Sequence, residues 1–157
     1  MTTNDEMATS DETIAVLNDL IETCKDGEYG FGLCTEYVDA PELRELLEHR
    51  TAQCRLAAEE LQRQVVLLRG DPDFGGSVSG AAHRGWVSMR GTLAGYSDPM
   101  LLEECERGED IALARYARAL HARLPPNIDA LIRTQFQGAR ANHDLVRSLK
   151  DRFAAAS

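Results

Sequence analysis

Five polar residues stand out as candidates for a buried site with its own chemistry. Glu28, Arg50, Glu109 and Asn142 each fall on a helical stripe of apolar residues, and His143 lies at the edge of one. Carboxylates and imidazoles are ligands that suit iron and manganese. Bundles that hold two such ions place a Glu on each of two helices and Glu-x-x-His on each of the other two. A metal centre is therefore one hypothesis.

The sequence departs from that ligand pattern at two of the four helices. Glu28 and Glu109 fit the two single-Glu positions, but Arg50 and Asn142 hold the corresponding places on the other two helices. The motif Glu-x-x-His occurs nowhere in the chain. An arginine in such a layer supplies a cation that pairs with carboxylates without any metal.

Three interpretations follow from these residues. At a rise of ~1.5 Å per residue they fall within a turn or two of one depth, so we expect a structural polar layer. The members of that layer are Glu28, Arg50, Glu109 and Asn142. The alternative is a non-standard iron or manganese site made by Glu28, Glu109 and His143, alone or together with Cys24 or Cys54. In the third interpretation Glu28 or Glu109 leans into solvent.

Four long helices are needed to bring these residues together. The first begins near Asp11, where Thr9 and Glu12 form a capping box. A break at residues 39–42 (DAPE) starts the second helix, with Asp39 expected to cap it and Pro41 in its first turn. Gly70 and Pro72 end that helix, residues 96–99 (YSDP) start the third, and Pro125-Pro126 start the last.

The link between the second and third helices is long. It runs from Gly70 to Ser97 and contains a short predicted helix over roughly 81–93. Such a link suits a crossover along the full length of a bundle, whereas a simple up-down bundle needs only a short loop. We therefore predict an all-α four-helix bundle over residues 11–154, after a disordered tail over residues 1–10. The alternative is one long kinked helix over 81–121.

Composition and charge exclude several classes of function. The net charge of −9 and the scattered basic residues argue against binding to nucleic acid or to an anionic membrane. The chain has no apolar run of ~20 residues and no secretory signal pattern at its N-terminus, so we expect a cytoplasmic protein. The four cysteines have no metal-binding spacing and are expected to be small core residues: Cys24, Cys34, Cys54 and Cys105.

Five segments carry a resemblance to a known family. They are residues 17–28 (LNDLIETCKDGE), 83–86 (HRGW), 103–110 (EECERGED), 124–126 (LPP) and 140–144 (RANHD). Together they resemble an uncharacterised bacterial family of ferritin-like four-helix-bundle proteins, catalogued as a domain of unknown function. The resemblance implies a ferritin-like fold. It implies no activity.

These observations lead to three hypotheses for function. The first is a non-catalytic stress-related or scaffold protein that contains a buried polar layer and forms a homo-oligomer. The second is an oxidative di-metal enzyme or a metal store with iron or manganese, which an outward-turned Arg50 would favour. The third is a partner-binding helical adaptor, which predicts an exposed apolar patch around Phe74, Trp86 and Tyr96.

Overall fold

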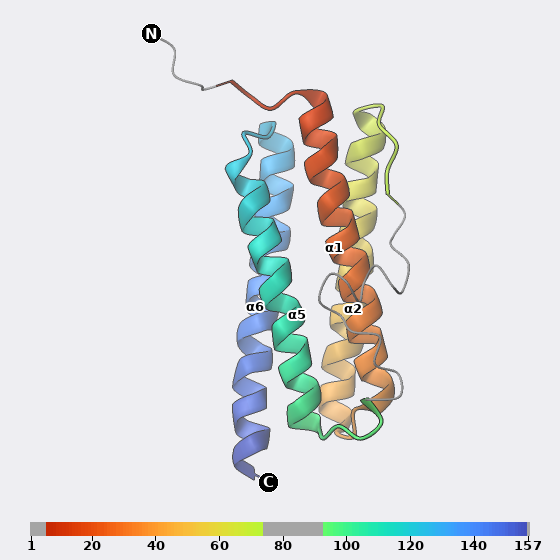
Figure 1. Ribbon diagram of the computed structural model, residues 1–157, viewed down its shortest axis with the longest axis vertical. Helices are drawn as coiled ribbons and strands as arrows, with labels where there is room; N and C mark the ends of the chain where they lie inside the picture. The colour runs from red at the N-terminus through yellow and green to blue at the C-terminus, as the bar shows by residue number, and fades with distance from the viewer. Residues whose placement is uncertain (1–5, 74–92, 157) are drawn as a thin grey trace.

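Four long helices make up the computed structural model, which describes residues 6–73 and 93–156. They are α1 (Ser10–Tyr37), α2 (Pro41–Leu67), α5 (Asp98–His121) and α6 (Pro126–Ala156). The helices lie side by side along the long axis of the molecule (Figure 1). The described residues contain no strand, so the all-α prediction is confirmed.

The order of the helices requires a crossover that runs the length of the bundle. In Figure 1, α2 ends at the top of the molecule and α5 begins at the bottom, so residues 68–97 connect opposite ends. The ferritin-like bundle predicted from the sequence is therefore confirmed. The predicted short helix over 81–93 lies outside the described residues apart from Leu93. The alternative of one helix over 81–121 is wrong, because α5 begins at Asp98.

Polar caps set where the helices begin. The Thr9 hydroxyl accepts a hydrogen bond from the backbone N–H of Glu12 at 3.1 Å, as the capping box predicts. Asp39 does not cap α2, because the N-cap is Ala40, which makes no side-chain capping bond. Instead the Asp98 carboxylate of α5 accepts the N–H groups of Asp39 and Ala40 at 2.8 and 2.9 Å. This joins the α1–α2 turn to the start of α5.

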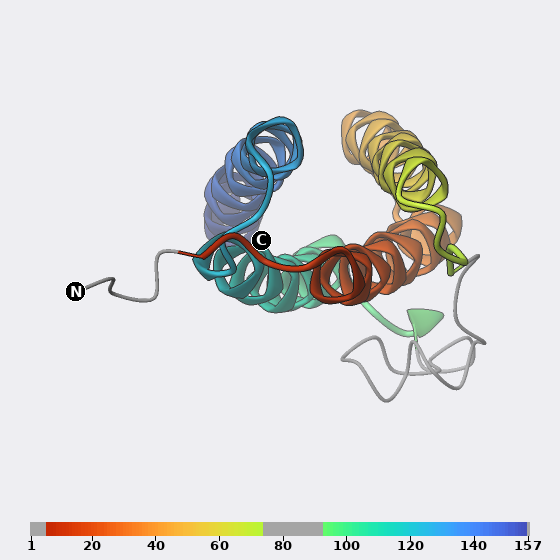
Figure 2. The same cartoon turned by 90° about the horizontal axis from the view of Figure 1, so that it is seen from above.

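Helix α1 packs against both α2 and α5, and α5 also packs against α6. By contrast α2 and α6 have few contacts with each other. Seen from above, the four helices form an open horseshoe with α2 and α6 at its two ends (Figure 2). All four cysteines are buried free thiols, as the sequence predicts. The interior therefore has a closed side around α1 and an open side between α2 and α6.

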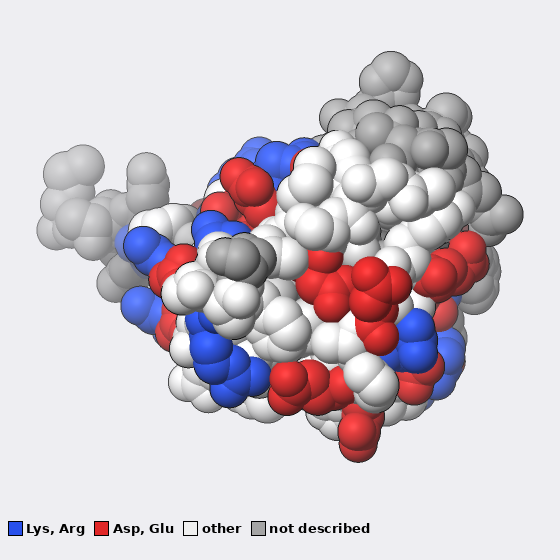
Figure 3. All heavy atoms as spheres, turned by 90° about the horizontal axis from the view of Figure 1, so that it is seen from below, with Lys and Arg blue, Asp and Glu red and all other residues white. Residues whose placement is uncertain are grey.

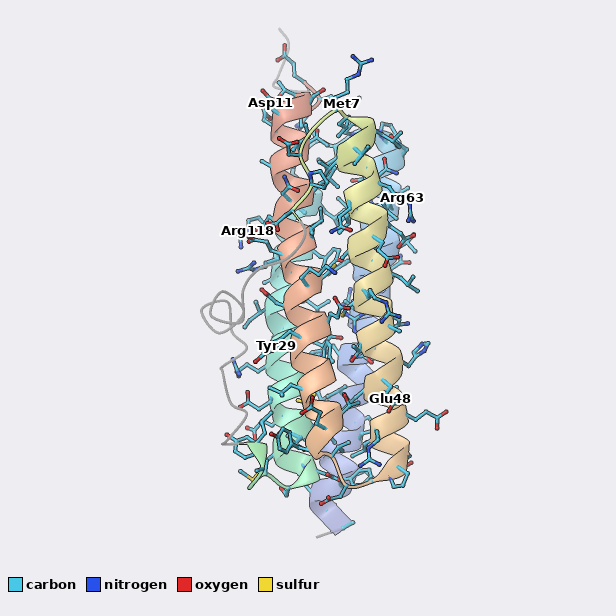
Figure 4. The ribbon with its side chains drawn as sticks, turned by 90° about the vertical axis from the view of Figure 1, so that its right-hand side faces the viewer. Met7, Asp11, Tyr29, Glu48, Arg63 and Arg118 are labelled. Atoms are coloured by element: carbon cyan, nitrogen blue, oxygen red, sulfur yellow. The ribbon has the colours of Figure 1, made fainter. Side chains whose placement is uncertain are left out.

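Charged and uncharged side chains are mixed on the surface at the lower end of the bundle (Figure 3). On the lower end, Lys and Arg side chains stand in small groups among Asp and Glu (Figure 3). Glu48 and Arg63 on α2 are exposed and point away from the bundle (Figure 4). Among the described residues, no helix combines the length and the apolar character needed to span a membrane.

Candidate functional site

An ion pair crosses the middle of the bundle from α2 to α5. Arg50 donates from Nε to Oε2 of Glu109 at 3.0 Å and from Nη2 to Oε1 at 2.9 Å. Arg50 is 7% exposed and Glu109 is 1% exposed. This two-point geometry uses the planar fork of the guanidinium, which lysine does not offer. The pair is therefore both buried and geometrically fixed.

Two further helices complete the surroundings of this pair. Asn142 of α6 donates from Nδ2 to Oε2 of Glu109 at 2.8 Å. The Arg50 guanidinium carbon lies 5.6 Å from the centre of the Phe31 ring of α1, a cation–π distance. Glu109 thus accepts three hydrogen bonds, and all four helices contribute to the site.

The electrostatics keep Arg50 charged despite its burial. Burial alone lowers the pKa of Arg50, but the neighbouring Cys54 and Glu109 raise it above its usual value. The positive guanidinium and the negative carboxylate cancel in net charge, which limits the cost of placing both in the interior. The local sequence explains the positions. Arg50 continues the buried stripe of Leu43 and Leu47 at spacings of three and four residues.

Glu28 does not join this network in the described contacts, although the predicted polar layer and the predicted metal site both include it. Its carboxylate instead accepts from Lys25 on the same helix at 3.2 Å, and its side chain is 26% exposed. The neighbouring Gly27 is the residue that faces α2 at this level, against Cys54. The side chain of Glu28 therefore emerges one residue further round α1, at the edge of the apolar stripe.

His143 lies apart from Glu109 in the described contacts. Its ring is 14% exposed, with Nε2 at 2.7 Å from Asp110 and Nδ1 at 3.1 Å from Asp144. Burial lowers the pKa of His143, but Asp144 and Asp110 more than offset this and raise the pKa above 6.5. The ring is thus a partner for surface carboxylates. The structure does not bring Glu28, Glu109 and His143 together.

The side chains present do not fit a di-metal centre. Within residues 6–73 and 93–156, no group of three or more His, Cys, Asp or Glu side chains is arranged to hold an ion. The carboxylate that pairs with Arg50, Glu109, already accepts from Arg50 and Asn142. A metal ion would need that carboxylate and would stand beside a fixed positive charge.

A second polar network lies alongside the first and was missed from the sequence. The Tyr116 hydroxyl of α5 donates to Oε1 of Gln135 on α6 at 2.8 Å and lies 3.1 Å from Cys24 Sγ on α1. Gln135 then donates to Glu60 and to the carbonyl of Ala57 on α2, both at 3.2 Å. Both Tyr116 and Gln135 fall on apolar stripes, but no spacing in the sequence links residues on different helices.

Burial makes the groups of this second network poor acids. It raises the pKa of the Cys24 thiol to about 11, although the hydrogen bond with Tyr116 and the Arg50 charge oppose the rise. Burial also raises the pKa of the Tyr116 hydroxyl well above its usual value. Both groups therefore stay protonated near neutral pH, and neither is activated as a nucleophile.

A cleft opens beside these two networks, on the side where α2 and α6 stand apart. Its volume is about 340 Å³, and it is lined by residues of all four helices, with Arg50 and Tyr116 among them. A Cβ added at Gly138 of α6 would meet no atom within 4 Å. On the closed side a Cβ added at Gly27 would lie 2.8 Å from Cys54 Sγ. Both glycines line the cleft, Gly27 where α1 and α2 approach closely and Gly138 where the space is empty.

Comparison with known proteins gives the family of the chain. A model described as Domain of unknown function (DUF2383) matches residues 12–122. The chain belongs to this family. No curated protein matches the chain in sequence. The description of the DUF2383 family assigns no activity, so function has to be argued from the site.

Solved structures resemble this DUF2383 protein over nearly its full length. One is the bacterioferritin-related protein of Bacteroides fragilis, described as a dodecameric thioferritin. It has a TM-score of 0.79 at 12% identity, covering 94% of this chain and 89% of that chain. Another is a Dps1 mutant from Mycobacterium smegmatis, with a TM-score of 0.76 at 13% identity, covering 90% of this chain and 96% of that chain. At such identities the likeness shows the ferritin-like fold.

Proposed function

We propose that the protein is a non-catalytic ferritin-like scaffold in which the Arg50 guanidinium takes the place of a metal cation. The observation that carries this proposal is the buried two-point ion pair between Arg50 and Glu109. The guanidinium is the cation that the central carboxylate needs, and Asn142 and Phe31 hold the pair in place. A bundle closed in this way keeps its shape without a cofactor.

Coulomb's law explains why Arg50 and a metal ion exclude each other. Two positive charges a few ångströms apart repel strongly in an interior from which water is largely absent. Arg50 has no route to neutrality, because its pKa lies above the usual value. An ion at Glu109 would therefore need Arg50 to swing out and lose both hydrogen bonds. The iron or manganese enzyme or store is the weaker hypothesis for that reason.

Self-assembly into a homo-oligomer is the second part of the proposal. The bacterioferritin-related protein of Bacteroides fragilis is described as a dodecamer, and it shares the fold of this chain. Helix α2 also exposes large apolar side chains that a partner surface would cover, namely Leu56, Val66 and Leu67. The expected stress-related role stays a prediction, because none of these contacts bears on it.

Metal analysis tests the first part of the proposal. The protein is purified without chelator, incubated with Fe(II) or Mn(II), desalted, and analysed by mass spectrometry for elements. We expect far less than one equivalent of iron, manganese or zinc per chain. An Arg50→Met variant treated identically is the matched control, because it frees Glu109 from its cation. Stoichiometric metal in the wild-type protein would overturn the proposal.

Light scattering coupled to gel filtration tests the second part. The expected result is a particle whose mass is a multiple of the 17.3 kDa chain. A Leu56→Glu, Val66→Glu double variant places charge on the exposed apolar face of α2 and is expected to give smaller particles. A strictly monomeric wild-type protein at high concentration contradicts a self-assembling scaffold.

A further inference from the structure

Arg50 gives the cleft between α2 and α6 a hydrogen-bond donor that its described neighbours do not use. Arg50 lines the cleft, and its Nε and Nη2 atoms are the ones that meet Glu109. Among the residues that the structure describes, no hydrogen bond reaches Nη1. The planar guanidinium directs the N–H groups of Nη1 away from the edge that holds Glu109. Nη1 is not among the described side-chain atoms that are fully buried without a partner, so it is reached by solvent and is available to an acceptor atom from a ligand.

The charges around the cleft select against charged ligands. Its lining carries three carboxylates, on Asp26, Glu60 and Glu109, and two guanidinium groups, on Arg50 and Arg115. Glu109 already balances the charge of Arg50. An anion would add to an excess of negative charge, and a cation would be placed beside Arg50. A neutral molecule with an acceptor oxygen avoids both costs.

The walls of the cleft suit a small apolar ring. Phe31, Leu56, Ile111 and Ala112 present apolar surface, and Gly138 leaves its own part of the wall empty. The volume of about 340 Å³ is at the lower end of the range for small-molecule sites. Leu56 is 55% exposed, so the mouth of the cleft is open to solvent. The site is therefore accessible without unfolding any helix.

We infer that this cleft is a binding site for a neutral ring-sized molecule that carries a carbonyl oxygen, of the class of an aromatic ketone. The carbonyl accepts from Nη1 of Arg50. The ring packs between α2 and α6 in the space beside Gly138. Leu56 lies both at the mouth of the cleft and on the exposed apolar face of α2, so the inference requires that self-assembly leaves the cleft open. It assigns Arg50 a second role in addition to its pairing with Glu109.

Titration with a matched pair of probes tests this site. Acetophenone carries the ring and the carbonyl, and ethylbenzene carries the ring alone. Binding is followed by NMR of the ¹⁵N-labelled full chain, including the side-chain signals of Arg50. We expect acetophenone to bind with a Kd on the order of 1 mM or tighter, and ethylbenzene about tenfold more weakly. We also expect acetophenone to shift the Arg50 guanidinium signals.

Two variants of α6 locate the binding. Gly138→Leu fills the empty wall of the cleft and should weaken acetophenone binding at least about tenfold. Ala141→Leu places the same side chain one turn away on an exposed position and should leave the Kd unchanged. Circular dichroism confirms that both variants stay helical. Equal binding of acetophenone to wild type and Gly138→Leu, or no binding at all, overturns the site.

The remaining outcomes decide the chemical class of the ligand. Equal affinity for ethylbenzene and acetophenone overturns the role of Arg50 as the donor. Benzoate has the same ring with a full negative charge and is expected to bind more weakly than acetophenone. Tighter binding of benzoate overturns the preference for a neutral molecule. Metal content is measured in a separate experiment. Failure of the ligand site can therefore be distinguished from failure of the proposed metal-free function.

Discussion

The closed and open sides of the bundle are held together by different forces. On the closed side α1 approaches α2 closely enough that a Cβ at Gly27 would collide with Cys54 Sγ at 2.8 Å. On the open side the described side-chain hydrogen bonds from α6 to α2 come from Gln135, at 3.2 Å to Ala57 and to Glu60, and from Arg152, at 3.5 Å to Glu42 near one end of the bundle. Apolar packing thus brings helices into contact, whereas polar bridges hold α6 at a distance that leaves a cleft.

The ion pair between Arg50 and Glu109 joins α2, which borders the open side, to α5 in the interior of the bundle. Its removal is therefore expected to have the largest effect. Glu109→Ala leaves Arg50 buried without a counter-charge and should lower the free energy of unfolding by about 3–5 kcal/mol. Urea denaturation followed by circular dichroism measures this change.

The control for the ion pair replaces both partners. Arg50→Met combined with Glu109→Leu removes both buried charges while keeping side-chain volume, and should be close to wild type in stability or above it. If Glu109→Ala lowers the free energy of unfolding by less than about 1 kcal/mol, the ion pair does not contribute to stability as proposed.

Alanine substitutions at Gly27 and Gly138 compare the close packing of α1 against α2 with the empty space beside α6. Gly27→Ala should destabilise by about 1–3 kcal/mol, because the new methyl group has to displace Cys54. Gly138→Ala should stabilise by about 0.5–1 kcal/mol, since alanine favours the helix and the space is empty. Thermal and urea unfolding of both variants give the two signs.

A Cys54→Ala background sharpens the glycine comparison. With the Cys54 sulfur gone, Gly27→Ala should lose most of its penalty, whereas Gly138→Ala should have the same effect as before. A penalty for Gly27→Ala that persists in this background would place the collision elsewhere than at Cys54 Sγ.

Asn142 is the polar bridge from α6 to the ion pair, and its loss should have a smaller effect. Asn142→Ala removes the 2.8 Å hydrogen bond to Glu109 and should cost about 1.5 kcal/mol. Glu109 keeps its two bonds from Arg50, so the carboxylate is not left without partners. Alanine favours the helix over asparagine, so a purely helical effect of Asn142→Ala would be stabilising. Unchanged or increased stability of Asn142→Ala contradicts a bridging role for Asn142.

The smallest effect is expected at His143, where α6 meets surface carboxylates. Asp144 and Asp110 raise the pKa of His143 above 6.5 in the folded protein, although burial opposes the shift. A raised pKa stabilises the fold fully below the unfolded pKa of about 6.5, and this contribution is lost as pH rises through the folded pKa. Asp110 and Asp144 are 60% and 73% exposed, so the contribution should stay below about 0.5 kcal/mol.

His143→Gln provides the measurement. The difference in unfolding free energy between wild type and this variant should be largest near pH ~6 and should shrink as the pH rises toward ~9. Asp110 and Glu106 of α5 face the ring together with Asp144. A difference that grows with pH has the wrong sign and would rule out the protonated ring as the stabilising form.

The sequence predicted those features of the site that depend on one helix at a time. Arg50, Glu109 and Asn142 fall on apolar stripes, and the structure brings these three side chains together. Glu28 shows the limit of stripe reasoning. At 3.6 residues per turn, two adjacent residues share the border of a stripe, and the neighbouring helix decides which of them faces inward. Here the close approach of Cys54 selects Gly27.

The sequence by itself determined the all-α architecture, the helix cap at Thr9 and the need for a long crossover, because these depend on local sequence, on periodicity and on chain length. Only the tertiary structure decided the spacing of α2 and α6, the network through Tyr116 and Gln135, and the cleft beside Arg50. The reason is physical: the distance between two helices is set by all the side chains between them at once, and no single stretch of sequence encodes it.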